Sequence, residues 1–133
     1  MQKTIALDEN QKTKLKEHAK KSEPNESCAL LFGKEDGQKI TVQEIFFTKN
    51  IDESQINFTI SNDELLEGYK KAEEKKLEVV GIFHSHPNSK AVPSQTDKKF
   101  MQSNPVVWII YSGEEENFKA YFLDSDIIEI SIS

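Results

Sequence analysis

Gly81-Ile82-Phe83-His84-Ser85-His86-Pro87 places two of the chain's three histidines at the end of an apolar run. The residues from Leu77 to Phe83 are mostly apolar, which is typical of a central strand covered on both faces. Pro87 prevents a simple continuation of that strand. We therefore expect both imidazoles at the carboxyl end of a buried strand, where the active sites of α/β folds commonly lie.

The spacing of the two histidines suits one metal ion. Side chains on a strand alternate between its faces, so His84 and His86 project to the same side. Asp97 would complete a His-His-Asp set, the three ligands that leave a fourth tetrahedral position for water in catalytic zinc sites. The pattern favours a metal hydrolase, although each histidine alone would more often be a packed or surface residue.

Ser94 and Glu26 could each have either a structural or a functional role. Ser94 followed by Asp97 is a capping pair at a helix start, which would also hold Asp97 rigidly near the histidines. Glu26, between a first helix and a buried strand, is our candidate for the base that a hydrolytic water needs. Its alternative reading is a solvated loop acid. His18 has no second ligand type nearby in the sequence, so we do not expect it to bind metal.

Composition narrows the class of protein. The 133 residues suffice for one domain, 1–133, and the net charge of −6 without a basic run makes nucleic acid a poor candidate for a partner. No apolar run approaches the roughly 20 residues that cross a bilayer, so we expect no membrane partner. Cys28 is the only cysteine and no signal-peptide pattern opens the chain, which favours a cytoplasmic location.

The remaining pattern predicts a mixed α/β domain with one sheet and helices packed against it. Strands are expected at 28–33, 39–47, 77–83, 106–111, 118–123 and 127–132, with Phe58 to Ile60 a short extended piece. A helix should run from Asp8 to about Lys21, and a second should open at a capping box, Ser61 to Glu64. Its packed face would carry Leu65, Leu66, Tyr69 and Ala72. A short third helix, 94–104, would turn Phe100 and Met101 inward.

Together these residues resemble the signature of the JAMM (MPN-plus) metalloproteases. The match comprises a glutamate, then His-Ser-His, seven residues, a serine and an aspartate three positions on, in this chain Glu26, His84-Ser85-His86, 87–93, Ser94 and Asp97. Similar flanking sequence includes Pro24, Leu30-Leu31 and Gly33, and Asn50 with Phe58 downstream. Ala29 stands where many relatives have glycine. The resemblance covers nearly the whole chain.

The resemblance implies a role for each matching position. His84, His86 and Asp97 would bind one Zn²⁺ ion with its catalytic water. Glu26 would activate that water and later protonate the leaving amine, and Ser94 would hydrogen-bond the oxyanion. Ser85 is expected to order the turn rather than take part in the chemistry.

The family also implies a fold and a substrate class. The fold would resemble that of cytidine deaminases, a mixed sheet flanked by two main helices and the short third one. Active members cleave peptide or isopeptide bonds after ubiquitin or ubiquitin-like modifiers. Eukaryotic members carry two insertions beside the groove, for which the eight residues between Asp97 and Val106 leave little room. Substrate capture would then depend on the core, a second copy in a homodimer, or a proteasome-like or carrier complex.

Two alternatives stay open from the sequence. Two histidines and a carboxylate also form the facial triad of non-heme iron oxygenases, whose usual host is a strand-rich barrel. A non-catalytic MPN-type scaffold would share the fold and bind a partner. Inactive relatives generally lack ligands, whereas this chain keeps all of them, so the scaffold ranks second to the peptidase.

Overall fold

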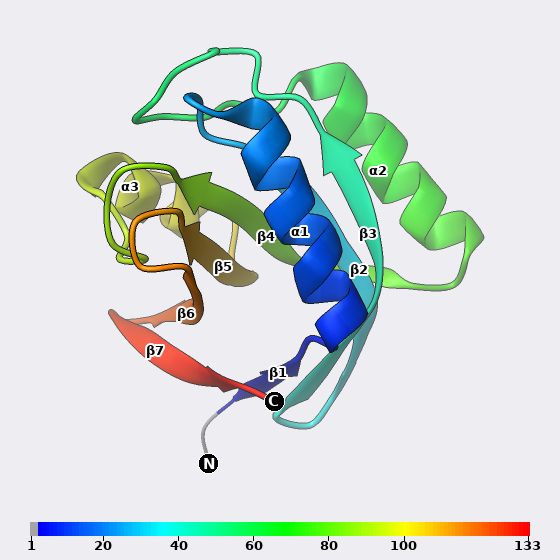
Figure 1. Ribbon diagram of the computed structural model, residues 1–133. Helices are drawn as coiled ribbons and strands as arrows, with labels where there is room; N and C mark the ends of the chain where they lie inside the picture. The colour runs from blue at the N-terminus through cyan, green and yellow to red at the C-terminus, as the bar shows by residue number, and fades with distance from the viewer. Residues whose placement is uncertain (1–2) are drawn as a thin grey trace.

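A computed structural model describes residues 3–133 of the chain. The described part contains three helices and seven strands (Figure 1). The helices are α1 (Glu9–Ser22), α2 (Asn62–Glu74) and α3 (Gln95–Ser103). The strands are β1 (Thr4–Ala6), β2 (Cys28–Asp36), β3 (Lys39–Thr48), β4 (Glu78–His86), β5 (Val107–Ser112), β6 (Asn117–Asp124) and β7 (Asp126–Ile132).

The strands form one mixed sheet in the order β1-β3-β2-β4-β5-β6-β7, which closes into a barrel. Closure depends on β1, which pairs in parallel with β3 on one side and with β7 on the other. The sequence pattern predicts the other six strands but not β1. Three residues are too few to show the alternation by which a strand is recognised. The extended piece 58–60 joins no strand pair among the described residues.

Helices cover the two faces of the sheet separately, α1 one face and α2 and α3 the other (Figure 1). Leu15 and Ala19 of α1 lie in the core that includes Leu31 and Phe83. The opposite core contains Ala72 of α2 and Met101 of α3 and surrounds Leu30, Ile82 and Trp108. Alternation along β4 therefore decides which helices each of its side chains meets.

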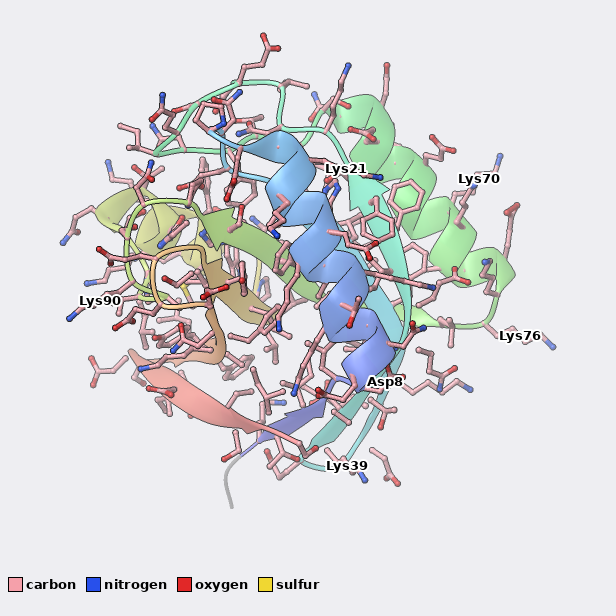
Figure 2. The ribbon with its side chains drawn as sticks, viewed as in Figure 1. Asp8, Lys21, Lys39, Lys70, Lys76 and Lys90 are labelled. Atoms are coloured by element: carbon pink, nitrogen blue, oxygen red, sulfur yellow. The ribbon has the colours of Figure 1, made fainter. Side chains whose placement is uncertain are left out.

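Helix α2 packs closely on the sheet through a glycine. A Cβ built on Gly68 would lie 2.5 Å from Leu30 Cδ1, closer than real side chains approach. The predicted packed face was partly wrong, because Leu66 is 72% exposed and Tyr69 52% exposed. Ala72 is buried and Leu65 packs against the core as predicted, with the buried Gly68 on the same side of the helix. Hydrophobicity alone could not show that Gly68, rather than Leu66 or Tyr69, lies on the sheet. Lys70 and Lys76 extend outward around this helix (Figure 2).

The predicted helix starts are present with one difference in detail. Asp8 and Gln11 form a reciprocal capping box at α1, and Ser94 and Asp97 form one at α3. At α2 the Ser61 hydroxyl accepts a hydrogen bond from the Glu64 amide, but Glu64 Oε1 accepts from the Lys49 amide instead of completing a box. In α3 Met101 is buried, whereas Phe100 is 38% exposed and not turned fully inward.

Strand β4 lies between β2 and β5 near the centre of the sheet. It runs antiparallel to β2, with Cys28 opposite His84, and parallel to β5, with Ile110 opposite His84. The two histidines are thus the last residues of a strand that is paired on both sides. Among residues 3–133, no helix is both long enough and apolar enough to span a bilayer.

Candidate metal centre

The candidate centre begins at the carboxyl end of β4, where His84 and His86 are buried on the face covered by α2 and α3. Ser85, between them, points to the opposite face. Its hydroxyl accepts a hydrogen bond from the Ser27 amide at 2.9 Å and lies 2.8 Å from Ser27 Oγ. Ser85 therefore ties β4 to the segment that precedes β2, rather than ordering the turn as we expected.

Three ligand atoms converge in front of β4. His84 Nε2 and His86 Nε2 are 3.0 Å apart, and Asp97 Oδ2 lies 3.1 Å from each of them. Asp97 is held by its place at the start of α3, since its Oδ2 accepts from the Ser94 amide at 2.9 Å. The cap that the sequence suggested as a plain structural reading is thus also what aims the carboxylate at the imidazoles.

Different contacts orient the two imidazoles. His86 Nδ1 lies 2.9 Å from the Lys90 carbonyl oxygen, which fixes a proton on Nδ1, so Nε2 is the nitrogen that faces the centre and would bind a metal ion. The Lys90 side chain points away from the molecule (Figure 2). His84 Nδ1 is buried without a hydrogen-bond partner among the described residues. Its ring is instead stacked on Phe58, with centroids 4.7 Å apart, and meets Trp108 edge-on.

A second carboxylate faces this triangle. Glu26 is 3% exposed, and its Oε2 lies 3.9 Å from His86 Nε2. Its other oxygen, Oε1, is buried with no hydrogen-bond partner in the described part of the chain. Burial raises the pKa of Glu26 to about 8, against the opposing effect of His86. A buried carboxyl oxygen without a partner is costly, and here it marks the place where a further polar group belongs.

The ionisation of the cluster follows from burial and from these short contacts. Burial lowers the pKa of His84, which favours the neutral imidazole that binds metals. Burial alone would raise the pKa of Asp97, but the hydrogen bonds to His84 and His86 outweigh burial and hold the pKa of Asp97 below its usual range. The pKa of His86 is raised despite its burial, because Asp97 and the Lys90 carbonyl accept its hydrogen bonds.

These residues fit a divalent metal ion. Glu26, His84 and His86 each offer a ligand atom, and the three atoms lie within 4.8 Å of one another. Ligands about 2.0–2.1 Å from a tetrahedral zinc ion are roughly 3.3 Å from each other. The separations of 3.0 to 3.1 Å among His84, His86 and Asp97 are close to that value. Two imidazole nitrogens and a carboxylate oxygen therefore face one point with the donor chemistry and spacing of a zinc site.

Ser94 stands at the rim of the centre. Its Oγ accepts a hydrogen bond from the Asp97 amide at 3.1 Å as part of the α3 cap. No acceptor for the hydroxyl proton occurs among the hydrogen bonds of residues 3–133, so the O–H remains available to a ligand. The same serine therefore fixes Asp97 and presents a donor beside it.

The structure brings together all five residues singled out from the sequence: Glu26, His84, His86, Ser94 and Asp97. His18 lies apart from them, with Nε2 2.9 Å from the Cys28 carbonyl oxygen. Sequence reasoning missed the supporting contacts. Phe58 stacks on His84, and the Lys90 carbonyl contacts His86, because of the paths of two loops. Loop paths leave no periodic signal in a sequence. The one available signal was that Phe58 belongs to the flanking sequence that resembles the family.

Comparisons with known proteins agree with this arrangement. The family model described as prokaryotic homologs of the JAB domain matches residues 9–124. The desampylase of Pyrococcus furiosus is 38% identical over 109 residues, covering 80% of this chain and 74% of that protein. The CysO-cysteine peptidase of Mycobacterium bovis is 30% identical over 95 residues, covering 71% of this chain and 64% of that protein.

Solved structures show the same fold. The solution structure of a protein from Desulfitobacterium hafniense superposes with a TM-score of 0.87 at 29% identity, covering 97% of this chain and 91% of the other. A JAB1/MPN domain protein from Archaeoglobus fulgidus superposes with a TM-score of 0.61 at 21% identity, covering 99% and 98%. The second likeness supports the fold alone.

Proposed function

Because the chain belongs to the family of prokaryotic homologs of the JAB domain, we propose that it is a zinc-dependent peptidase or isopeptidase. Its substrates are conjugates of ubiquitin or a ubiquitin-like modifier, which it cleaves after the modifier's C-terminus. Membership of this family, expected from the motif, is confirmed. The names of two relatives, a desampylase and a CysO-cysteine peptidase, support a peptidase acting on a small protein modifier.

One observation carries the proposal. The triangle formed by His84, His86 and Asp97 faces a buried carboxylate, Glu26, that has an unpartnered oxygen. Asp97 Oδ2 is 3.1 Å from His86 Nε2, whereas Glu26 Oε2 is 3.9 Å from it. These distances support Asp97 as the third ligand. They leave Glu26 to act on a water molecule rather than to bind the ion.

Zinc held by His84, His86 and Asp97 would supply Lewis acidity, which polarises the scissile carbonyl and lowers the pKa of a coordinated water. Glu26 takes a proton from the attacking water, a role suited to a buried carboxylate within reach of the centre. The same residue then returns the proton to the nitrogen of the leaving amine. Without that proton the nitrogen would depart as an unstable anion.

Ser94 stabilises the charge that forms on the carbonyl oxygen as the water attacks. Its hydroxyl proton is free because the cap uses only the oxygen as an acceptor. A fixed donor aimed at the developing oxyanion stabilises the transition state more than the ground state, which lowers the barrier. The rigid first turn of α3 supplies this preorganisation together with Asp97.

The proposal includes a setting for the enzyme. The only cysteine, Cys28, is buried, and burial raises the pKa of its thiol to about 12, so it is not a nucleophile. A single cysteine allows no intrachain disulfide, a pattern common in reducing compartments, and we infer a cytoplasmic location from it. Only the rest of α3 and residues 104–106 separate Asp97 from β5, which leaves little room for an inserted binding segment. Capture of the modifier therefore rests on the core surface, a second copy of the chain or a carrier complex.

The test is a cleavage assay with metal analysis. The substrate is a ubiquitin-like protein ending in Gly-Gly, fused to a reporter, with a matched fusion ending in Ala-Pro. We expect one zinc ion per chain and cleavage after Gly-Gly that a chelator abolishes and added zinc restores. A zinc-free preparation that cleaves equally well, or a zinc-loaded one that cleaves none of a panel of such fusions, would contradict the proposal.

A further inference from the structure

We propose that Asn50 is a positioning residue that holds the backbone of Glu26 in place for proton transfer. The inference rests on the proposed function, because it takes Glu26 as the base. Among the described residues, the Asn50 side chain forms no hydrogen bond to a candidate metal ligand, and all its hydrogen bonds are with backbone groups. It acts through the segment that carries Glu26.

Glu26 lies just outside the sheet, where its backbone has no strand neighbour to hold it. The pairing of β2 with β3 ends at Cys28 opposite Thr48. Continuing that antiparallel register by two residues would put Glu26 opposite Asn50. The two segments do not form this further backbone pair. Instead, the Asn50 side-chain amide donates to the Glu26 carbonyl oxygen at 3.0 Å and so replaces the missing backbone donor.

The other contacts of Asn50 explain why its side chain is well placed for this task. Nδ2 donates a second hydrogen bond to the Asn57 carbonyl oxygen at 2.9 Å. Oδ1 accepts from the Asp52 amide at 3.0 Å and from the Thr59 amide at 3.1 Å. Four hydrogen bonds use the full capacity commonly available to an amide side chain, which fixes its orientation. A freely rotating surface asparagine would offer Glu26 no such support.

The loop tied by Asn50 also carries a wall of the centre. Asn57 and Thr59 are the neighbours of Phe58, whose ring stacks on His84. The loop returns to Glu26 a second time, because the Ser54 carbonyl oxygen accepts from the Glu26 amide at 2.8 Å. Asn50 thus connects the base on one side of the centre with the aromatic ring behind His84 on the other.

The direction of each hydrogen bond allows a selective substitution. Asn50→Asp keeps an oxygen acceptor for the Asp52 and Thr59 amides but replaces the donor that serves Glu26 with a second oxygen. That oxygen would face the Glu26 carbonyl oxygen and repel it. Asn50→Ala removes both the donor and the acceptor of the side-chain amide. Thr59→Val is the matched control, because it breaks the hydrogen bond from Thr59 Oγ1 to Asp52 Oδ2 in the same loop without altering the Asn50 side chain.

The test combines kinetics with a readout that needs no activity. For Asn50→Asp and Asn50→Ala we expect kcat to fall at least 10-fold with KM within about twofold and one zinc ion retained. Thr59→Val should stay within about twofold of the wild type. In crystal structures of the metal-free Asn50 variants, the Glu26 carboxylate should move away from His86 while His84, His86 and Asp97 keep their positions.

A double-variant comparison separates positioning from a general structural role. In a Glu26→Gln background, Asn50→Asp should cause less than a twofold further loss of the residual rate, since its effect passes through Glu26. An undiminished loss there, a change confined to KM, or an unmoved Glu26 would overturn the proposal, as would failure of both Asn50 variants to fold. If Glu26 moves but the wild type cleaves no fusion, the positioning stands and the proposed function fails.

Discussion

Glu26 Oε2 lies 3.9 Å from His86 Nε2, while the other oxygen of the same carboxylate is buried without a partner among the described residues. The acid comes from the segment before β2 and the imidazole from the end of β4, sixty positions later in the chain. They are brought together by the register of β2 on β4 and by the hydrogen bond from the Ser27 amide to the Ser85 hydroxyl, next to the two residues.

Removing one imidazole should remove the metal. His84→Ala takes away one of three ligand atoms, so we expect less than a tenth of the wild-type zinc content after dialysis and no cleavage of the Gly-Gly fusion. Metal analysis of the purified variant measures this. His18→Ala is the control, because the third histidine bonds to the Cys28 carbonyl away from the centre and should leave the zinc content unchanged. Full zinc content in His84→Ala would remove this residue from the ligand set.

Ser94→Ala should lose both a helix cap and a donor to the oxyanion. Loss of a serine cap costs about 1 kcal/mol in the free energy of unfolding. Loss of an oxyanion donor lowers kcat by about 10²–10³-fold. Denaturant unfolding and cleavage kinetics measure the two effects separately.

Ser61→Ala provides the comparison for Ser94, because Ser61 caps α2 with the same kind of hydrogen bond and lies outside the centre. We expect a similar loss of stability and less than a twofold change in kcat. Equal rates in the two serine variants would mean that Ser94 serves only as a cap.

The stability of the metal-free protein should fall as pH rises between about 5 and 8. The pKa of Glu26 is about 8 in the folded protein, against an ordinary value of 4.5, so between these values the folded state holds a proton that the unfolded state has released. Unfolding is then favoured by rising pH, by at most about 1.4 kcal/mol per unit. Urea unfolding in the presence of a chelator, at intervals of half a pH unit, measures the slope.

Glu26→Gln isolates the contribution of this carboxyl, because glutamine stays neutral throughout the range. The variant should match the wild type near pH 5 and exceed it in stability by pH 8. His86, whose pKa is raised in the folded protein, is present in both proteins and contributes to both slopes. Parallel curves for the two proteins would show that the buried carboxyl is already ionised in the metal-free state.

Most of the fold could be predicted from the sequence, as could the five candidate site residues that the structure brings together, whose roles stay predictions. The sequence shows local patterns at the site: the apolar run before His84, the period-two spacing of the histidines and the Ser94-Asp97 cap. Such patterns reflect local backbone geometry, so they can be recognised without knowing the fold. The strand β1 could not be predicted, because three residues paired on both sides show no periodicity. The packed face of α2 was only partly predicted, because Leu65 and Ala72 pack as expected whereas close approach at Gly68 leaves Leu66 and Tyr69 exposed.

The supporting contacts of the site required coordinates. Nothing in the sequence shows that the Asn50 amide replaces a backbone donor for Glu26, or that the Lys90 carbonyl orients His86. Both contacts depend on loop paths rather than on a repeating pattern. The role of Ser85 likewise depended on knowing which segment lies beside the end of β4.

The zinc content and cleavage rate of Glu26→Gln, measured on one preparation, test the central claim most directly. If Glu26 moves protons and does not bind the ion, the variant keeps one zinc ion per chain and loses about 10²–10⁴-fold in kcat. Loss of the zinc would make Glu26 a ligand, and full cleavage with zinc bound would show that another group is the base.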